Sequence, residues 1–199
     1  MASLSSRTFP SITSMIRLDH THVTALLHRY RANSSAARKH ALARNACLAL
    51  EVHAQLEEEI FYPAMARAVG ESEVLAKSKP EHDEMRRYIA QLRGMSPESG
   101  EFDDTFFALM RGVLHHVADE ETTLLPQAER ALAGQLGELG QQMTRRRLQL
   151  VRPHAREIAS TAIQSFPLAS MAVAAGALTL GLALLRPSRR PRSGQPLTH

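Results

Sequence analysis

The sequence predicts an all-α protein: an up-down-up-down four-helix bundle with an extra C-terminal amphipathic helix and a hydrophobic C-terminal helix. Three observations support this fold class. Four long stretches repeat apolar residues at the three-to-four-residue spacing of one helix face, glycine and proline divide the chain between most of them, and no segment alternates as a strand does. The 199 residues suit one compact domain with an appendage.

The four predicted bundle helices lie near residues 10–31, 34–68, 73–94 and 101–133. The apolar stripe of each contains a histidine where dry core is expected, and in two of them a glutamate follows one turn later. Buried ionisable groups need partners, so a polar site is expected on the bundle axis. Its candidate residues are His20, His53, Glu57, His82, His116 and Glu120.

An internal repeat relates the two halves of the bundle. HAQLEEEIFYP, from His53 to Pro63, matches HHVADEETTLLP, read from His116 to Pro126, and LDHTHV around His20 matches PEHDEM. Each half is therefore a helix pair with one lone histidine and one H-x-x-x-E, and two such pairs pack about an approximate two-fold axis. Each proline falls inside a helical pattern and should kink or widen the helix just beyond the glutamate.

The spacing of these residues favours a metal site. Residues four apart lie on one helix face, so each H-x-x-x-E pair reaches one small site. Imidazole and carboxylate ligands without thiolate suit iron, manganese or zinc, and two glutamates near a two-fold axis favour two metals with bridging carboxylates. By symmetry, we expect His20 and His53 on one metal, His82 and His116 on the other, and Glu57 and Glu120 across both.

Charge and composition narrow the function classes. Residues 1–135 hold 15 Lys and Arg against 18 Asp and Glu, whereas residues 136–199 hold 9 against 2. The body is mildly acidic and carries no zinc-finger or RNA-recognition pattern, so no nucleic-acid partner is expected. The single cysteine, Cys47, excludes a disulfide framework and a cysteine-based zinc cluster.

The predicted organisation has five segments: an N-terminal tail (1–9), the bundle (10–133), a basic amphipathic linker helix (134–161), a candidate transmembrane helix (162–185) and a basic disordered tail (186–199). The uncharged run from Phe166 to Leu185 is about as long as a helix that crosses the hydrocarbon core. It is rich in alanine and glycine, so packing in an oligomer is the alternative. We expect a C-terminal single-pass membrane anchor, with the bundle in the cytoplasm because no cleavable signal is recognisable.

The motifs LDHTHV, HAQLEEEIFYP, PEHDEM and HHVADEETTLLP resemble those of the haemerythrin family, in its broad HHE cation-binding form, over roughly residues 10–133. The resemblance implies a four-helix bundle with a non-haem, oxo- or hydroxo-bridged di-iron site, and therefore two iron ions rather than manganese or zinc. It also implies reactions with oxygen, nitric oxide or peroxide, or a role in iron handling.

The sequence departs from the oxygen-carrying members of that family, which supply a fifth histidine one turn from the third-helix ligand. Ser78 and Arg86 stand one turn from His82, so the fifth histidine is missing. The second carboxylate is Glu120, with Glu121 as a possible substitute. Reversible oxygen carriage is therefore not expected, and the set is more like that of members that handle iron or repair iron centres.

Two classes of function remain open. One is a binding or sensing protein for oxygen, nitric oxide or iron, and the other is an enzyme with a peroxidase-like or nitric-oxide-reducing centre. No acid or base outside the ligand set is identified, so catalytic residues and the redox partner stay unassigned and binding is slightly favoured. A purely structural bundle is a third alternative. Solvated or packing roles are expected for the other polar residues near the motifs, namely His22, His28, His40, His115, Glu58, Glu59, Tyr30, Tyr62 and Tyr88.

Overall fold

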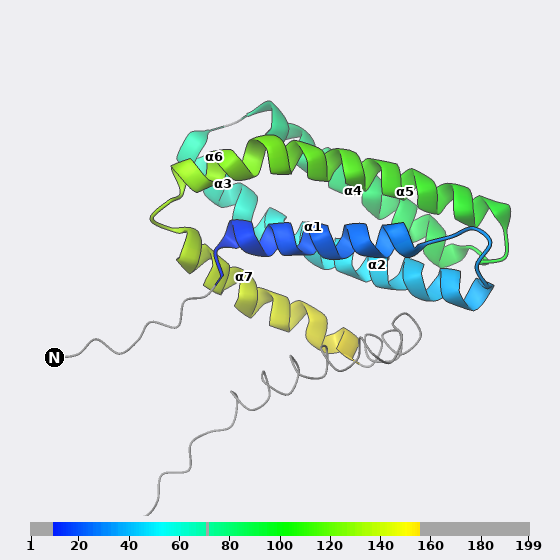
Figure 1. Cartoon of the computed structure of the whole chain (residues 1–199). Coiled ribbons are helices and arrows are strands. Elements are labelled where there is room, and N and C mark those ends of the chain that lie inside the picture. The colour runs from blue at the N-terminus through cyan, green and yellow to red at the C-terminus, as the bar shows by residue number, and fades with distance from the viewer. Residues whose placement is uncertain (1–9, 71, 156–199) are drawn as a thin grey trace, which may run out of the picture.

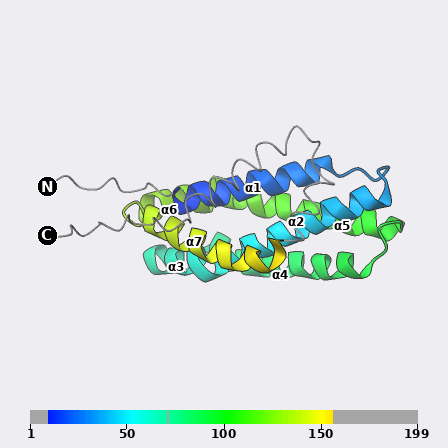
Figure 2. The ribbon, with the colours of Figure 1, turned by 90° about the horizontal axis from the view of Figure 1, so that it is seen from below.

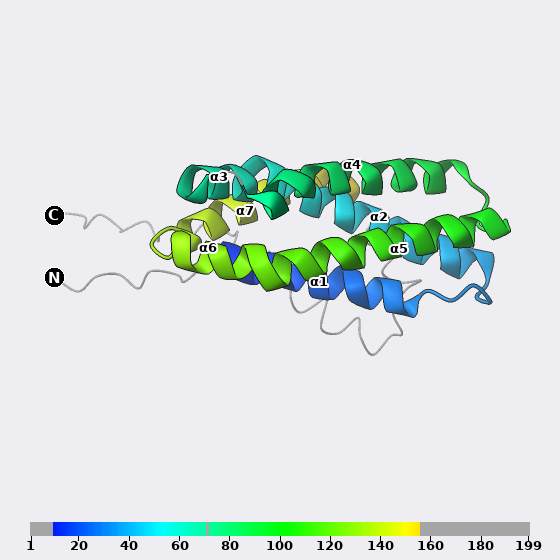
Figure 3. The same ribbon diagram turned by 90° about the horizontal axis from the view of Figure 1, so that it is seen from above.

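The computed structural model describes residues 10–70 and 72–155, which are helical and contain no strand. The bundle consists of α1 (Ile12–Arg29), α2 (Ala36–Leu56), α4 (Glu73–Gly94) and α5 (Gly100–Asp119). Each helix contacts the next, and α5 also contacts α1, so the four close around one axis (Figures 1 and 3). The described part of the chain therefore has the all-helical architecture that the sequence predicts.

Serine side chains begin all four bundle helices. The Oγ atom of the residue before each helix accepts a hydrogen bond from a backbone N–H in the first turn, at 3.1 to 3.4 Å. These N–H groups have no partner within the helix, so the caps stabilise each start by about 1 kcal/mol. The serines are Ser11, Ser35, Ser72 and Ser99.

Two π-helical turns interrupt the second and fourth bundle segments. The first, η1 (Glu57–Phe61), joins α2 to α3 (Tyr62–Val69), and the second, η2 (Glu120–Leu124), joins α5 to α6 (Leu125–Ala131). A proline follows each turn by two residues and has no N–H for the regular helical hydrogen bond. The widening expected at the two prolines is therefore confirmed, and each widened turn begins at a candidate glutamate.

A fifth long helix, α7 (Leu136–Val151), packs against α1 and α2 on the outside of the bundle (Figure 2) and continues into a short 3₁₀ turn, η3 (Arg152–His154). It lies within the stretch predicted as an amphipathic linker at 134–161. Leu139, Gly140 and Met143 are buried, so the helix is part of the packed domain rather than a bare connection.

Apolar side chains form two clusters along the bundle. One includes Tyr30, Leu50 and Phe106, and the other includes Ile16 and Phe61. Along every bundle helix the candidate metal ligands lie between residues of these clusters or at their edge. Burial of this apolar surface stabilises the fold and shields the polar residues from solvent.

The predicted hydrophobic helix at 162–185 and both predicted tails lie outside the described residues. Within residues 10–70 and 72–155, no helix combines the length and the apolar character needed to cross a bilayer.

We predict that Gly140→Ala destabilises the protein. A Cβ atom at Gly140 would lie 2.0 Å from the backbone oxygen of Pro10 and 3.1 Å from the backbone nitrogen of Ile12, and backbone atoms cannot rotate away. We expect the free energy of unfolding to fall by about 1–3 kcal/mol, as for other overpacking changes, in denaturant titrations followed by circular dichroism.

Gly137→Ala is the matched control in the same helix, because a Cβ there meets nothing within 4 Å. That variant should keep or slightly raise stability, since alanine favours the helix by up to about 1 kcal/mol. Equal stability of the two variants would show that α7 does not approach the start of α1 this closely.

Candidate metal centre

The six candidate residues come together on the bundle axis. His20 comes from α1, His53 from α2, His82 from α4 and His116 from α5, and the two glutamates are the first residues of η1 and η2. All six residues are buried, with exposed fractions of 4% or less. The set is Glu57 and Glu120 together with these four histidines, and the structure brings every member into one centre.

The Nε2 atoms of the four histidines face the two carboxylates. Glu57 Oε2 lies 3.2 Å from His53 Nε2 and 3.4 Å from His82 Nε2. Glu120 Oε2 lies 3.3 Å from His20 Nε2. The Nε2 atoms of His82 and His116 are 3.1 Å apart, so two protons on these nitrogens would repel each other.

Two overlapping groups of ligand atoms result. In each group, one atom from every residue lies within 4.8 Å of the others, which is close enough to hold a cation. His53 and Glu57 belong to both groups. The first adds His82 and His116, and the second adds His20 and Glu120. This arrangement fits two neighbouring cation sites that share a carboxylate.

Several buried atoms of the centre make no hydrogen bond. A buried polar atom without a partner costs stability, so such atoms are rare in folded proteins and call for a ligand, an ion or a water. In the centre these atoms are His20 Nε2, His53 Nε2, Glu57 Oε1 and Glu120 Oε2. Because they are imidazole nitrogens and carboxylate oxygens, metal cations would satisfy all four, and the residues present fit the expected metal.

A carboxylate lies at the outer nitrogen of every histidine. An Nδ1–H that donates to a carboxylate fixes the ring and leaves Nε2 as the free acceptor that a metal needs. The Nδ1···O distances are 2.8 Å for His20 and Glu121, 3.0 Å for His82 and Glu58, 2.8 Å for His116 and Glu81, and a longer 3.6 Å for His53 and Asp19.

These outer carboxylates occupy matching positions in the internal repeat, but their role at the histidines was not predicted from the sequence. Asp19 and Glu81 stand directly before the lone histidines, and Glu58 and Glu121 directly after the two central glutamates. An acidic residue at the matching place in both halves was the available signal. Of the two carboxylates considered for the second half, Glu120 is fully buried in the centre, whereas Glu121 contacts the outer nitrogen of His20.

Arginines brace three of the outer carboxylates. Arg17 Nε lies 3.1 Å from Glu121, and Arg86 Nη2 lies 2.7 Å from Glu58. The third arginine comes from outside the four-helix bundle, since Arg147 on α7 donates two hydrogen bonds of 2.5 Å to Asp19. Helix α7 is thereby connected to His53 through one carboxylate.

Tyr62 is a further polar residue of the centre. Its hydroxyl lies 3.0 Å from Glu57 Oε2, 2.8 Å from Glu120 Oε1 and 3.4 Å from His82 Nε2. Packing was the expected role of this tyrosine, and its ring does lie in an apolar cluster, but the hydroxyl also hydrogen-bonds to both central glutamates. The repeat could have indicated a special role for Tyr62, because the equivalent position of the other half is Leu125 and only one half supplies a phenol.

The other two tyrosines lie away from the centre, and the two positions one turn from His82 supply no fifth ligand, as expected. Tyr30 donates to Asp103 and Tyr88 to Glu84, both away from the centre. Ser78 Oγ donates to the backbone oxygen of Val74, and Arg86 pairs with Glu58, so neither position adds a metal ligand.

Burial and charge set the protonation of the metal-free centre. Burial opposes the ionisation of Glu57, yet the surrounding histidines, His53 foremost, hold its pKa well below the usual value. Burial also opposes the charging of His116, but the nearby carboxylates of Glu57 and Glu81 raise its pKa to about 10. Burial together with the two glutamates raises the pKa of Tyr62. Without metal, protonated imidazole thus balances the carboxylates.

Solved structures include a similar fold. A crystal structure of a hemerythrin HHE cation-binding domain-containing protein from Mycobacterium kansasii superposes with a TM-score of 0.62 and covers 78% of this chain and 99% of that chain. The two sequences are 19% identical, so the likeness concerns the fold.

Among curated proteins, a DNA nickase from Nostoc sp. is 31% identical over 114 residues, or 57% of this chain. The chain spans about a third of that relative's length, 32%. The family model described as "Hemerythrin HHE cation binding domain" matches residues 11–128, which is more than half of the chain and includes the whole candidate centre. The protein therefore belongs to the haemerythrin HHE cation-binding domain family.

Proposed function

We propose that the protein holds two iron ions in this centre and reacts with or senses oxygen, nitric oxide or peroxide. The observation that carries the proposal is the pair of overlapping His and Glu groups whose inward atoms are buried without hydrogen bonds. His20 and His53 would hold one ion and His82 and His116 the other. Glu57 and Glu120 would lie between the two ions.

The ligand types favour iron. Imidazole suits iron and zinc, carboxylate suits manganese and magnesium, and a mixed set with a nearby phenol and no thiolate suits iron best. When bound, iron supplies the one-electron chemistry with oxygen, nitric oxide or peroxide that the protein's own side chains lack.

The side chains of the chain orient and shield that chemistry. The outer carboxylates hold the imidazoles with Nε2 inward, and the apolar clusters on either side keep bulk water out. Tyr62 makes the two sides unequal, because its hydroxyl lies beside His82 and between the two glutamates. It can donate a proton to a carboxylate oxygen or, as a phenolate, serve as a further ligand on the His82 side.

Binding or sensing is the better supported class. Tyr62 is the one titratable hydroxyl that the described residues place at the centre, and the outer carboxylates are paired with the imidazoles rather than directed at the space between the ligands. A peroxidase-like or nitric-oxide-reducing enzyme, or an iron-storage or iron-centre repair protein, is the alternative. Sustained turnover of peroxide or nitric oxide by the iron-loaded protein would favour the enzyme.

We predict two iron atoms per chain and their loss on removal of central ligands. His53→Ala and Glu120→Ala should each lose one or both irons, since each leaves a gap in a buried ligand set. His28→Ala is the control, because His28 is an exposed histidine on α1 that bonds its own helix backbone. Elemental analysis of the full chain would measure the content. Full iron content in both central variants would contradict the assignment.

Metal uptake should release protons near neutral pH. The folded pKa of His116, about 10, lies above the ordinary 6.5, so protonated His116 stabilises the metal-free fold fully below pH 6.5, and this contribution disappears as the pH rises through 10. Metal needs the neutral ring, so binding should release about one proton from His116 at pH 7 and fewer toward pH 10.

An indicator dye in weakly buffered, anaerobic solution would follow this release when Fe(II) is added. His116→Ala should release less, because the raised pKa belongs to that ring. Equal proton release at pH 7 and pH 10 by the unmodified protein would show that His116 is not protonated in the metal-free centre.

We predict that the reduced, iron-loaded protein is oxidised by oxygen and does not give the oxygen back. Reversible carriage in the family depends on a fifth histidine, and here Ser78 and Arg86 have other partners. Stopped-flow absorption after mixing with oxygen would follow the reaction. Recovery of the reduced spectrum under vacuum would contradict it.

The same spectra test the place of Tyr62. If its phenolate ligates ferric iron, the oxidised protein should show a visible phenolate-to-iron absorption band that Tyr62→Phe lacks. Tyr88→Phe is the matched control, because that hydroxyl contacts Glu84 away from the centre.

We also propose, from the sequence alone, that the C-terminal part holds the protein at a membrane with the bundle on the cytoplasmic side. The support is the uncharged run from Phe166 to Leu185 and the arginines that follow it. The full chain should sediment with membranes in a low-salt lysate, and truncation after Ser160 should release an iron-containing protein. Recovery of the full chain in the supernatant would contradict the anchor.

A further inference from the structure

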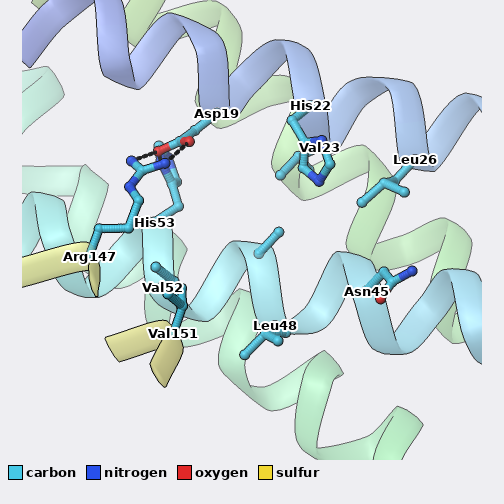
Figure 4. Close-up of a pocket in the computed structure, with 11 residues that line it drawn as sticks. Asp19, His22, Val23, Leu26, Asn45, Leu48, Val52, His53, Arg147 and Val151 are labelled. Carbon is cyan, nitrogen blue, oxygen red and sulfur yellow. Dashed lines mark hydrogen bonds and ion pairs between the residues drawn. The ribbon is translucent and has the colours of Figure 1, made fainter. Parts of the chain in front are cut away.

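A cavity of about 230 Å³ lies in the seam between α1, α2 and α7, next to the metal centre. Figure 4 shows Asp19, His53 and Arg147 together at one end, and Leu26 and Asn45 toward the other. Between them the lining is mostly apolar, with Val23, Leu48, Ala49, Val52 and Val151. The cavity thus combines an apolar body with a charged end, and His22 and Asn45 add two polar side chains elsewhere in the lining.

The packing of α7 explains why space remains there. The first half of α7 is held closely, because Leu139, Gly140 and Met143 are buried against the bundle. The second half has no fully buried residue, and Arg147 and Val151 line the cavity instead. At this end α7 contacts the bundle through the Arg147–Asp19 and Arg146–Glu59 ion pairs and the partly buried Leu150.

The chemistry of the lining limits what can bind. The two charges at the polar end pair through two hydrogen bonds, so an ionic ligand would compete with that pair, and only Arg147 Nε remains there as a buried donor without a hydrogen-bond partner. Apolar cavities of about 150 Å³ are known to stay dry and to bind benzene or xenon. This cavity is partly open and has polar groups at its ends, so water can enter, but its apolar body favours a small, uncharged, apolar molecule over an ion.

We propose that this cavity is a binding site for one small, uncharged, apolar molecule about the size of a benzene ring. Binding itself does not require iron. Its consequence rests on the proposed function, since a molecule in the cavity contacts the Asp19–His53 pair and strengthens the contact of α7 with the bundle. Occupancy would then be transmitted to the metal ligand His53 through its outer carboxylate.

Calorimetric titration of the full chain with fluorobenzene tests the site. We expect saturable binding of one molecule per chain, and at least about tenfold weaker binding in Ala49→Phe, which fills the cavity from α2. Ala90→Phe is the matched control, because Ala90 is exposed on α4 outside the cavity. Binding that does not saturate in the unmodified protein, or that is equal in Ala49→Phe and Ala90→Phe, overturns the proposal.

Two further measurements keep the test independent of one variant. Val151→Phe fills the cavity from α7 and should weaken binding in the same way. In the unmodified protein, Overhauser contacts from the fluorine should reach methyl groups of Val23 and Val52, and contacts only to methyl groups elsewhere overturn the site.

The visible spectrum of the iron-loaded protein separates the two proposals. We expect fluorobenzene to shift it in the unmodified protein and not in Ala49→Phe. Saturable binding to protein that takes up no iron would support the cavity while contradicting the iron centre, and saturable binding without a spectral shift would overturn the coupling to His53.

Discussion

The burial of ionisable side chains on the axis of a helical bundle is the constraint on which the rest of the structure depends. Taking a charge out of water costs several kcal/mol unless it is neutralised or paired. Every central histidine therefore has an outer carboxylate, and the inward atoms that lack hydrogen bonds are left for cations. Each π-helical turn begins at a central glutamate, and interruptions of this kind are frequent at functional sites.

Charge balance explains why the centre suits cations. The carboxylates in and around it are Asp19, Glu57, Glu58, Glu81, Glu120 and Glu121, and the arginines that brace them are Arg17, Arg86 and Arg147. Three arginines leave an excess of negative charge when the histidines are neutral. Without metal, protons on the imidazoles reduce that excess, as the raised pKa of His116 indicates. Two divalent cations would compensate the same charge without protonating the rings, so metal and protons compete for one network.

The sequence predicted the parts of the structure that depend on periodicity. Helix faces and the histidines on them follow from spacing, and the interruption at Pro63 and Pro126 follows from the missing N–H. The outer carboxylates were not predicted because they flank the apolar stripe and resemble a solvated helix face until the neighbouring helix is in place. The packing of α7 was missed for a related reason, because its contacts involve Gly140 and a backbone oxygen that no pattern of side chains reveals.

The repeat makes the two halves of the centre alike, and the departures from it make them different. Tyr62 lies beside His82, and its counterpart Leu125 brings no polar group. On the other side, the carboxylate at His53 is held by Arg147 from a helix outside the repeat. The metal position at His82 would thus have a phenol next to it, whereas the position at His53 would be connected to α7 and the cavity beneath that helix. Under the proposed function, a duplicated scaffold with one addition on each side would have one position suited to reaction and one connected to the cavity.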